Sequence, residues 1–264
     1  EMMDVGISLH SSKKTQPIMN GAQMNNVVLY CKSYRPDFPH LLKLCESVAA
    51  YNRDNLPFYI SVPSRDIATL FDIIPEALLT NVYVISDDSI MDGPLPDNWL
   101  SQQLVKSSFW KVGVCENYFM LDSDTYFIRD FTVSDFMYDE DTPYTTCHEQ
   151  KDLFSWSVWN SDQLGFDPRK SFIDDKLKIM NVFGRTGKCY DFGPGPIMWS
   201  VKVWQTLDET LKLNGMTFAD ALNICPSEVT WYGETIMSTQ VIRLMPVEPV
   251  FKSFHYYQQY MDYK

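Results

Sequence analysis

Hydrophobic and polar positions along the first half of the chain switch repeatedly between two periods. Short apolar runs rich in β-branched and aromatic residues predict buried strands, and these runs lie at 26–31, 56–62, 81–86 and 118–121. Apolar residues at helical spacing predict the helices between them, at 38–49, 64–74 and 97–114. Residues 87–98, rich in Asp and Pro, are expected to form a loop. The alternation predicts an α/β, Rossmann-like fold, in which helices flank a mostly parallel central sheet.

The second half of the chain is less regular. Helical patterns are expected at 168–182, 201–213 and 227–243. A Gly/Pro loop is expected at 191–200, after an aromatic-rich stretch at 147–166. Because the chain has no internal repeat and no linker of low complexity, residues 24–264 are predicted to form a single domain. Residues 1–23 are polar and lack the hydrophobic region of a signal peptide, so we expect a disordered arm or the remnant of a tag.

The charge balance narrows the classes of partner. The chain has 22 Lys and Arg against 34 Asp and Glu, which gives a formal charge of −12. Without a basic cluster, nucleic acid and anionic membranes are not expected as partners, and an anionic ligand would require recruited positive charge, most simply a bound cation. The six cysteines are scattered without a CxxC pair, which favours a reduced, cytoplasmic protein. No apolar run reaches the roughly 20 residues of a transmembrane helix.

Two aspartates, Asp122 and Asp124, end the fourth predicted strand in the stretch YFMLDSD. Ionised carboxylates at the end of a buried strand are costly unless something pairs with them. Two of them in one turn can share a hard divalent cation, which prefers oxygen ligands. A second D-x-D, formed by Asp139 and Asp141, lies in a polar stretch before Pro143 and is interpreted as a solvated loop.

Four features in this order make the chain resemble the GT-A-fold glycosyltransferases, which use nucleotide-diphosphate sugars. They are Asp122-Ser123-Asp124 at a strand end, the loop Gly193-Pro194-Gly195-Pro196, the helix start Ser227-Glu228, and the late His255. The resemblance covers residues 26–258. Within this class, the chain is similar to uncharacterised bacterial and viral sugar transferases that have an "SE…YG" segment. It implies a GT-A-like domain with a nucleotide-binding half at about 26–131 and an acceptor-binding half at about 132–258. If the protein is of viral origin, the resemblance also implies that it is located in the cytoplasm of the host cell.

The resemblance implies a bound Mn²⁺ or Mg²⁺ that neutralises the departing diphosphate. Asp124 would be the direct ligand, Asp122 would contact the ribose or reach the metal through water, and His255 would contact the metal or a phosphate. The alternative for His255 is an ordinary hydrogen-bonded histidine among aromatic residues. Glu228 is placed as the general base of an inverting reaction, with Glu234 and Asp191 as competing candidates. The alternative for Glu228 is a helix-start carboxylate stabilised by the helix dipole.

The donor nucleotide is expected at the carboxyl ends of the first three strands, where the loops 32–36, 62–66 and 86–88 converge by topology. The aromatic ring of Tyr34 could stack on the base, and Ser33 and Asp87 could bond its edge. Lys106 is the candidate phosphate contact. The full set of predicted donor-binding residues is Ser33, Tyr34, Val62, Asp87, Gln103, Lys106, Asp122, Ser123, Gly193 and Gly195.

Aromatic residues in the second half suggest an acceptor site, because aromatic faces pack well against sugars. The candidates are Trp156, Trp159, Trp231 and Tyr232, and the alternative for all of them is core filling.

The predicted function is therefore transfer of a hexose or pentose from a nucleotide-diphosphate sugar, preferably a UDP-sugar, to a hydroxyl of a glycan or glycoconjugate. Two other classes stay open. One is a haloacid-dehalogenase-type phosphatase with Asp122 as nucleophile, although Tyr126 stands where that motif requires Thr or Val. The other is a carbohydrate-binding module without catalytic activity.

Overall fold

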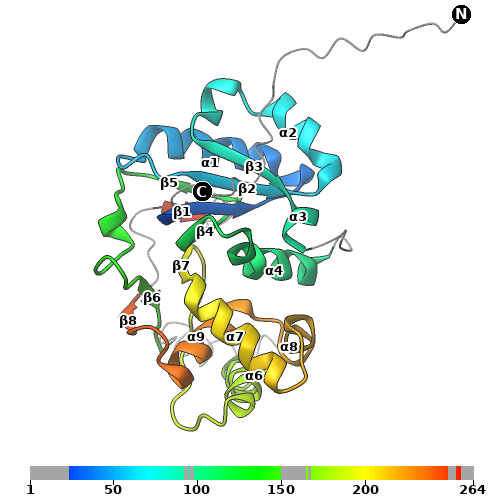
Figure 1. Cartoon of the computed structure of the whole chain (residues 1–264), viewed down its shortest axis with the longest axis vertical. Helices are drawn as coiled ribbons and strands as arrows, with labels where there is room; N and C mark the ends of the chain where they lie inside the picture. The colour runs from blue at the N-terminus through cyan, green and yellow to red at the C-terminus, as the bar shows by residue number, and fades with distance from the viewer. Residues whose placement is uncertain are drawn as a thin grey trace, which may run out of the picture.

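A five-stranded sheet with strand order β3-β2-β1-β4-β7 forms the centre of the molecule (Figure 1). The computed structural model describes residues 24–91, 95, 98–149, 165, 168–248 and 254–256, so the predicted arm at 1–23 lies outside the described residues. Four strands run parallel: β1 (Asn25–Lys32), β2 (Phe58–Val62), β3 (Val82–Ser86) and β4 (Cys115–Asp122). The edge strand β7 (Ile197–Ser200) is antiparallel to β4. The predicted α/β fold with a mostly parallel sheet is confirmed.

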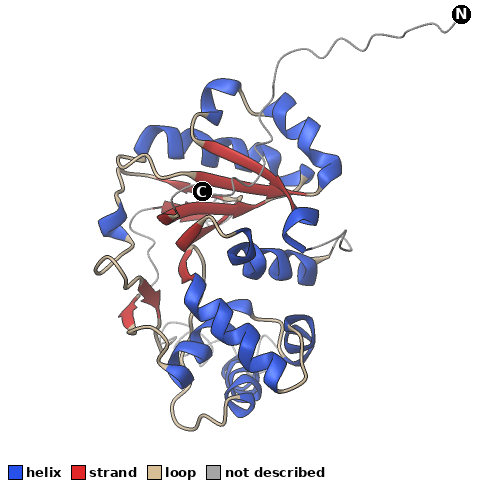
Figure 2. Ribbon diagram, viewed as in Figure 1, coloured by secondary structure: helices blue, strands red, loops and turns tan. Residues whose placement is uncertain are grey.

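The sheet is covered on both faces, which explains the nearly continuous apolar strands. In β1, Val27, Leu29 and Cys31 face one core together with α1 (Phe38–Tyr51) and α2 (Ile67–Ile73). Val28 and Tyr30 face the opposite core, which α4 (Trp99–Ser108) covers. Figure 2 shows the strands as the layer between these two groups of helices. A strand buried on both faces needs apolar residues at successive positions rather than at alternate ones.

Two local details differ from the sequence prediction in the first half. Residues 87–91 form a short helix, α3 (Asp87–Met91), inside the segment predicted as a loop. The hydroxyl of Ser86 accepts the backbone N–H of Ser89 at 3.2 Å, and two aspartates fill the first turn, which favours a helix start. The helix predicted at 97–114 is α4 followed by the 3-10 turn Phe109–Val112, and Gly113 ends it with a φ of 71°.

The helices of the second half lie below the sheet in Figure 1. They are α6 (Pro168–Val182), α7 (Val201–Leu213), α8 (Phe218–Ile224) and α9 (Glu228–Thr239). The predicted helices at 168–182 and 201–213 are confirmed, whereas α9 ends before residue 243. The short α8 was not predicted, although Thr217 and Asp220 form a capping box at its start. The segment 191–200 was predicted as a loop throughout, but its last four residues pair with β4 as strand β7.

The remaining strands are short and pair in twos. Strand β5 (Thr125–Phe127) pairs with β9 (Phe254–Tyr256), and β6 (Tyr144–Thr146) pairs with β8 (Met245–Val247). Single-turn 3-10 helices lie at Arg35–Asp37, Ser64–Asp66, Glu76–Leu79 and Val133–Asp135. All six cysteines are free thiols. Among the described residues, every helix is too short or too polar to cross a lipid bilayer.

Candidate functional site

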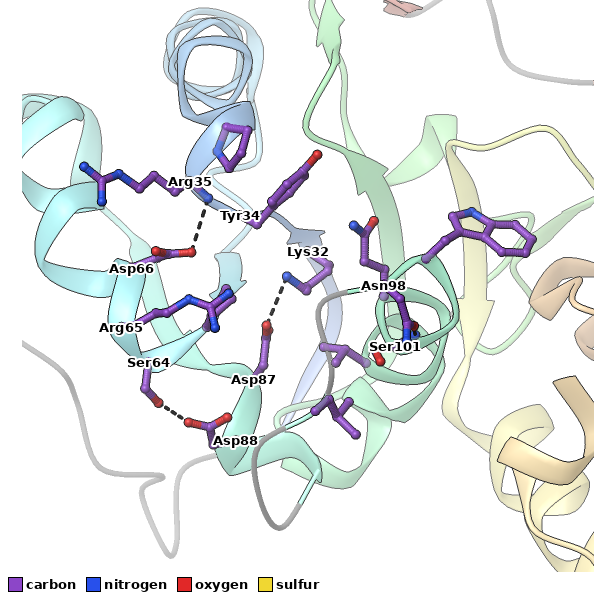
Figure 3. Close-up of a pocket in the computed structure, with 16 residues that line it drawn as sticks. Lys32, Tyr34, Arg35, Ser64, Arg65, Asp66, Asp87, Asp88, Asn98 and Ser101 are labelled. Carbon is purple, nitrogen blue, oxygen red and sulfur yellow. Dashed lines mark hydrogen bonds and ion pairs between the residues drawn. The ribbon is translucent and has the colours of Figure 1, made fainter. Parts of the chain in front are cut away.

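The loops that follow β1, β2 and β3 line one cleft at the carboxyl edge of the sheet (Figure 3). The cleft has a volume of about 890 Å³, and the amino-terminal half of α4 closes its other side. The predicted convergence of these three loops is confirmed. The lining residues are Lys32, Tyr34, Arg35, Pro36, Pro63, Ser64, Arg65, Asp66, Asp87, Asp88, Leu95, Asn98, Trp99, Ser101, Gln102 and Val105.

Ion pairs and hydrogen bonds organise the cleft wall. The Nζ of Lys32 lies 3.0 Å from Oδ2 of Asp87, and both side chains are at most 10% exposed. Burial raises the pKa of Asp87, although the Lys32 ammonium opposes this shift. The carboxylate of Asp66 accepts the backbone N–H of Arg35 at 3.3 Å and so ties the first loop to the second. The hydroxyl of Ser64 donates to Asp88, which joins the second loop to the third (Figure 3).

Several buried polar atoms at this edge have no hydrogen-bond partner among the described residues. They include Ser33 Oγ, Asp87 Oδ1 and both amide atoms of Gln103. Leaving such an atom unpaired costs about 1–3 kcal/mol, so in native proteins each one calls for a bound water, ion or ligand. The three side chains belong to the predicted donor-binding set. Of the three, only Asp87 lines the cleft, whereas Ser33 and Gln103 are buried and lie outside its lining.

The acidic turn lies next to the cleft. Asp122 is the last residue of β4 and stands opposite Lys32, the last residue of β1, in the parallel register. The hydroxyl of Thr125 donates to the carbonyl of Asp122 at 2.6 Å and closes the turn. Ser123, at the middle of the turn, donates from its hydroxyl to Oδ2 of Asp37 at 3.0 Å. The turn is therefore fixed on one side by its own strand and on the other by the loop after β1.

The carboxylates of this turn experience burial and mutual repulsion. Burial raises the pKa of Asp124, and the nearby charges of Asp122 and Asp37 raise it further. Asp124 is therefore harder to ionise than an exposed aspartate unless a cation lies beside it.

Lys106 and Glu228 complete the cluster from two different helices. The ammonium of Lys106, on α4, donates to Oδ1 of Asp122. Burial alone would lower the pKa of Lys106, but the carboxylates of Asp122 and Glu228 raise it above its usual range. Burial raises the pKa of Glu228, the first residue of α9, and the Lys106 ammonium opposes that shift. We call Asp37, Asp122, Asp124, Glu228 and Lys106 the acidic cluster.

The donor atoms of the acidic cluster suit a hard divalent cation. The cluster contains four carboxylates and one ammonium, so it carries an excess of negative charge, and oxygen ligands are those that Mn²⁺ and Mg²⁺ prefer. The described residues contain no preformed set of three or more His, Cys, Asp or Glu ligands. Asp122 and Asp124 would therefore need oxygens from a ligand or from water. The backbone of His255 pairs with Tyr126, which brings strand β9 beside the acidic turn; its side chain lies outside the description.

The glycine loop contacts the start of α9. A side chain at the buried Gly193 would meet Val229, the second residue of α9, at 3.4 Å. The backbone N–H of Gly193 donates to Oδ1 of Asp191 at 3.3 Å, and the carbonyl of Gly193 lies 2.6 Å from Nε2 of His148. The loop is thus held close to the first turn of α9. Gly195 lies in the same loop and is partly exposed.

Asp191 takes part in a buried polar network beside the glycine loop. Its carboxylate lies 3.4 Å from the ammonium of Lys176, which donates to Thr230 at 2.6 Å. The hydroxyls of Thr230 and Ser227 lie 2.7 Å apart, so the network leads to the first turn of α9. Through these contacts Asp191 helps to hold the start of α9 in place.

Glu234 is not placed to act as a base. Its side chain is fully buried, and Arg185 binds it through two guanidinium nitrogens, Nη2 at 2.6 Å from Oε1 and Nε on Oε2. A carboxylate used in this way has no access to an acceptor hydroxyl. The prediction that Glu234 competes for the role of base is therefore wrong, because Arg185 already binds its carboxylate. The local sequence could not reveal this contact.

The predicted acceptor platform is also wrong for the two aromatic residues that the structure describes. Trp231 is 0% exposed and donates to the carbonyl of Cys225 at 2.9 Å. Tyr232 is 1% exposed and accepts the N–H of Ser200 at 2.7 Å. Both fill the core, which was the stated alternative. Trp156 and Trp159 lie outside the described residues.

Other predicted positions shift by one residue or are joined by residues that the sequence did not single out. Val62 is buried in β2, and its neighbour Pro63 lines the cleft instead. The cleft also contains Arg35, Asp66 and the exposed Trp99, all of which sequence reasoning missed. Arg35 and Arg65 lie within the predicted loops 32–36 and 62–66, so their positive charge was the feature of the sequence that could have marked them as lining residues.

Comparisons with known proteins complete the description of the chain. No curated protein matches it. Among solved structures, it is similar to the WbbM bifunctional glycosyltransferase in its apo form, with 14% identity and a TM-score of 0.47 over 82% of this chain and 39% of that one, so it spans well under half of WbbM. It is also similar to the galactosyltransferase LgtC in complex with donor and acceptor sugar analogs (15% identity, TM-score 0.40) and to an active-site mutant of LgtC (15%, 0.42), in each case over 74% of this chain and 69% of the other. The profile of a family of unknown function, DUF6492, matches residues 27–246, and the chain belongs to this family.

Proposed function

We propose that the protein is a metal-dependent glycosyltransferase that moves a hexose or pentose from a nucleotide-diphosphate sugar to a hydroxyl of a glycan or glycoconjugate. The observation that supports this most directly is the adjacency of the cleft and the acidic cluster. Lys32 lines the cleft and stands beside Asp122 in the sheet register, while Val105 lines the cleft and precedes Lys106. A ligand with a polar, planar end and a charged end fits two such neighbouring regions.

The nucleoside would occupy the cleft. The ring of Tyr34 offers a face for the base, and the unpaired Oδ1 of Asp87, which belongs to the same lining, offers a hydrogen bond to a polar group of the nucleoside. Arg35 and Arg65 add positive charge at the cleft wall. Together with Lys32, these arginines balance the three aspartates of the lining, Asp66, Asp87 and Asp88, so the cleft repels an anionic ligand less than the rest of a chain whose net charge is −12. We propose a uridine nucleotide, in line with the UDP-sugar donor expected from the resemblance to GT-A-fold glycosyltransferases.

The diphosphate would lie between the cleft and the acidic turn. Asp122 and Asp124 would hold a divalent cation, which when bound neutralises charge on the leaving diphosphate. Lys106 would add a second positive charge from α4. The raised pKa of Asp124 fits this assignment, because a carboxylate that repels its neighbours is stabilised in its ionised form by a cation.

Glu228 would act as the general base. Burial raises the pKa of its carboxyl, which brings it closer to the pH at which a base works best. The acceptor oxygen would form its bond to the anomeric carbon as the bond from that carbon to the diphosphate breaks, and the hydroxyl proton would pass to Glu228. This single displacement inverts the anomeric centre. Neither Glu234, bound to Arg185, nor Asp191, which is held beside Lys176, competes well for this role.

The test is binding and turnover of nucleotide sugars by matched variants. We expect the melting temperature of the protein to rise with UDP-sugars in the presence of Mn²⁺ and to rise much less without it. The substitution Asp124→Asn should abolish this shift and the release of UDP while the protein stays folded. Asp141→Asn, in the second D-x-D, is the control, because its side chain is exposed and belongs neither to the cleft lining nor to the acidic cluster. Retained turnover in Asp124→Asn would contradict the proposal.

The same experiment separates the two other classes. A phosphatase of the dehalogenase type would be phosphorylated on Asp122, yet Oδ1 of that residue already accepts a hydrogen bond from Lys106. Such an enzyme would release phosphate from simple phosphate esters without preference for nucleotides. A carbohydrate-binding module would bind glycans unchanged after Asp124→Asn. The burial of Trp231 and Tyr232 weakens this last alternative.

A further inference from the structure

Lys106 occupies an unusual position for a lysine next to carboxylates that are expected to hold a cation. Its side chain is only 13% exposed, and its ammonium donates to Oδ1 of Asp122, which is itself 30% exposed. The same ammonium acts electrostatically on Glu228 at the start of α9. Lys106 thus binds the very carboxylate group that the proposed function assigns to the metal.

A divalent cation and an ammonium compete for the same carboxylate oxygen, because their charges repel each other. The ammonium is nevertheless the group that compensates Asp122 and Glu228 when no ligand is bound. Lysine carries its charge on a flexible four-carbon stem, so it can move to a new partner without a change in the backbone. The nearest new partner would be the diphosphate, because Val105, the residue before Lys106, lines the cleft.

We propose that Lys106 is an internal counter-ion that exchanges partners when the donor binds. In the free protein it holds Asp122, and with cation and nucleoside diphosphate present it leaves Asp122 and contacts the diphosphate. The proposal rests on the proposed function, since it assigns the exchange to the same site. It predicts that the cation binds weakly by itself and that the nucleotide strengthens this binding, because the diphosphate gives the displaced ammonium a new partner.

The proposal predicts that replacing Lys106 raises the affinity for Mn²⁺ alone and lowers the affinity for UDP. In Lys106→Met the competing ammonium is absent, so Mn²⁺ alone should bind about tenfold more tightly, a change within the usual range for coupled sites. The affinity for UDP in saturating Mn²⁺ should fall by a similar factor, because the diphosphate loses its contact with the ammonium. A lysine that only supported the fold would weaken both affinities.

The experiment measures Mn²⁺ binding by electron paramagnetic resonance of the free ion, with and without UDP, and UDP binding by calorimetry. Lys106→Gln is a second variant, because its amide can keep a neutral hydrogen bond to Asp122 if the methionine variant does not fold. Lys111→Met is the matched control: this lysine is five residues further along the chain, is exposed and lies over Trp110, so both affinities should stay unchanged.

The outcomes separate this inference from the proposed function. If the native protein binds neither UDP nor Mn²⁺ with UDP, the proposed function fails. If it binds both, but the two Lys106 variants bind Mn²⁺ alone no more tightly than the native protein, the exchange is refuted while the proposed function stands. If UDP binds the native protein equally well without Mn²⁺, the metal dependence of the proposed function fails, and the exchange fails with it.

Discussion

The buried ion pair between Arg185 and Glu234 allows a quantitative test of the structural role assigned to Glu234. The Glu234 carboxylate is 0% exposed, and the Arg185 side chain is 12% exposed. Removing one partner of such a pair leaves an uncompensated buried charge, which costs about 3–5 kcal/mol. We therefore expect Arg185→Met to lower the free energy of unfolding by about that amount.

The assay is urea denaturation of native protein, Arg185→Met, Glu234→Met and the double variant. If two buried charges are replaced together by apolar side chains, much of the loss should be recovered, because no unpaired charge remains. A protein of this size loses about 2–4 °C of melting temperature per kcal/mol, so each single variant should melt about 10 °C lower. A loss below about 1 kcal/mol in Arg185→Met would refute the reasoning. If folded Glu234→Met lost all transfer activity at a temperature where the native fold persists, Glu234 would regain its place as a candidate base.

Three further perturbations test other parts of the site. Because burial raises the pKa of Glu228, kcat/KM should fall at acid pH with an apparent pKa above that of an ordinary glutamate. Glu228→Gln should remove this acid limb of the pH profile and most of kcat, and it should leave the affinity for UDP unchanged. Gly233→Ala should unfold the protein or lower its melting temperature severely, since a Cβ there would lie 2.0 Å from the Phe192 ring; a normal melting curve would contradict this. Tyr34→Ala should weaken UDP binding, measured by calorimetry, by about 1–3 kcal/mol if the ring stacks on the base, and Tyr138→Ala, at an exposed tyrosine, should not.

The parts of the fold that the sequence predicted are those that local physics determines. The parallel strands β1, β2 and β4 are buried on both faces and the edge strand β3 is partly buried, so their apolar runs stand out. The topology of a parallel sheet then brings the loops after β1, β2 and β3 to one edge. The end of β4 at Asp122 follows from the same pattern. Short elements such as α3 and β7 were missed, because five or four residues carry too little periodicity to be recognised.

The contacts that complete the site could not be predicted, because they join distant segments through tertiary packing. Ser123 bonds Asp37, 86 residues away, and Arg185 reaches Glu234 over 49 residues. No local pattern distinguishes a glutamate that ends in a buried ion pair from one that faces a ligand. The two buried aromatic residues of α9 show the same limit, since a tryptophan in a core and one on a sugar-binding surface look alike in a sequence.

The raised pKa values of two carboxyl groups in the acidic cluster connect the stability of the fold to the function of the site. The raised pKa values of Asp124 and Glu228 mean that the folded protein binds their protons more tightly than the unfolded chain does. Stability contributed by these groups is therefore present at low pH and is lost as the pH rises through their folded pKa values. At neutral pH, Glu228→Gln should then raise the free energy of unfolding even as it removes activity. A carboxylate that weakens the fold at the pH where it is ionised is expected where a ligand or a cation restores the balance of charge. If urea denaturation showed instead that Glu228→Gln destabilises the protein at neutral pH, Glu228 would be a helix-start carboxylate that serves the fold, and the base would have to be sought elsewhere.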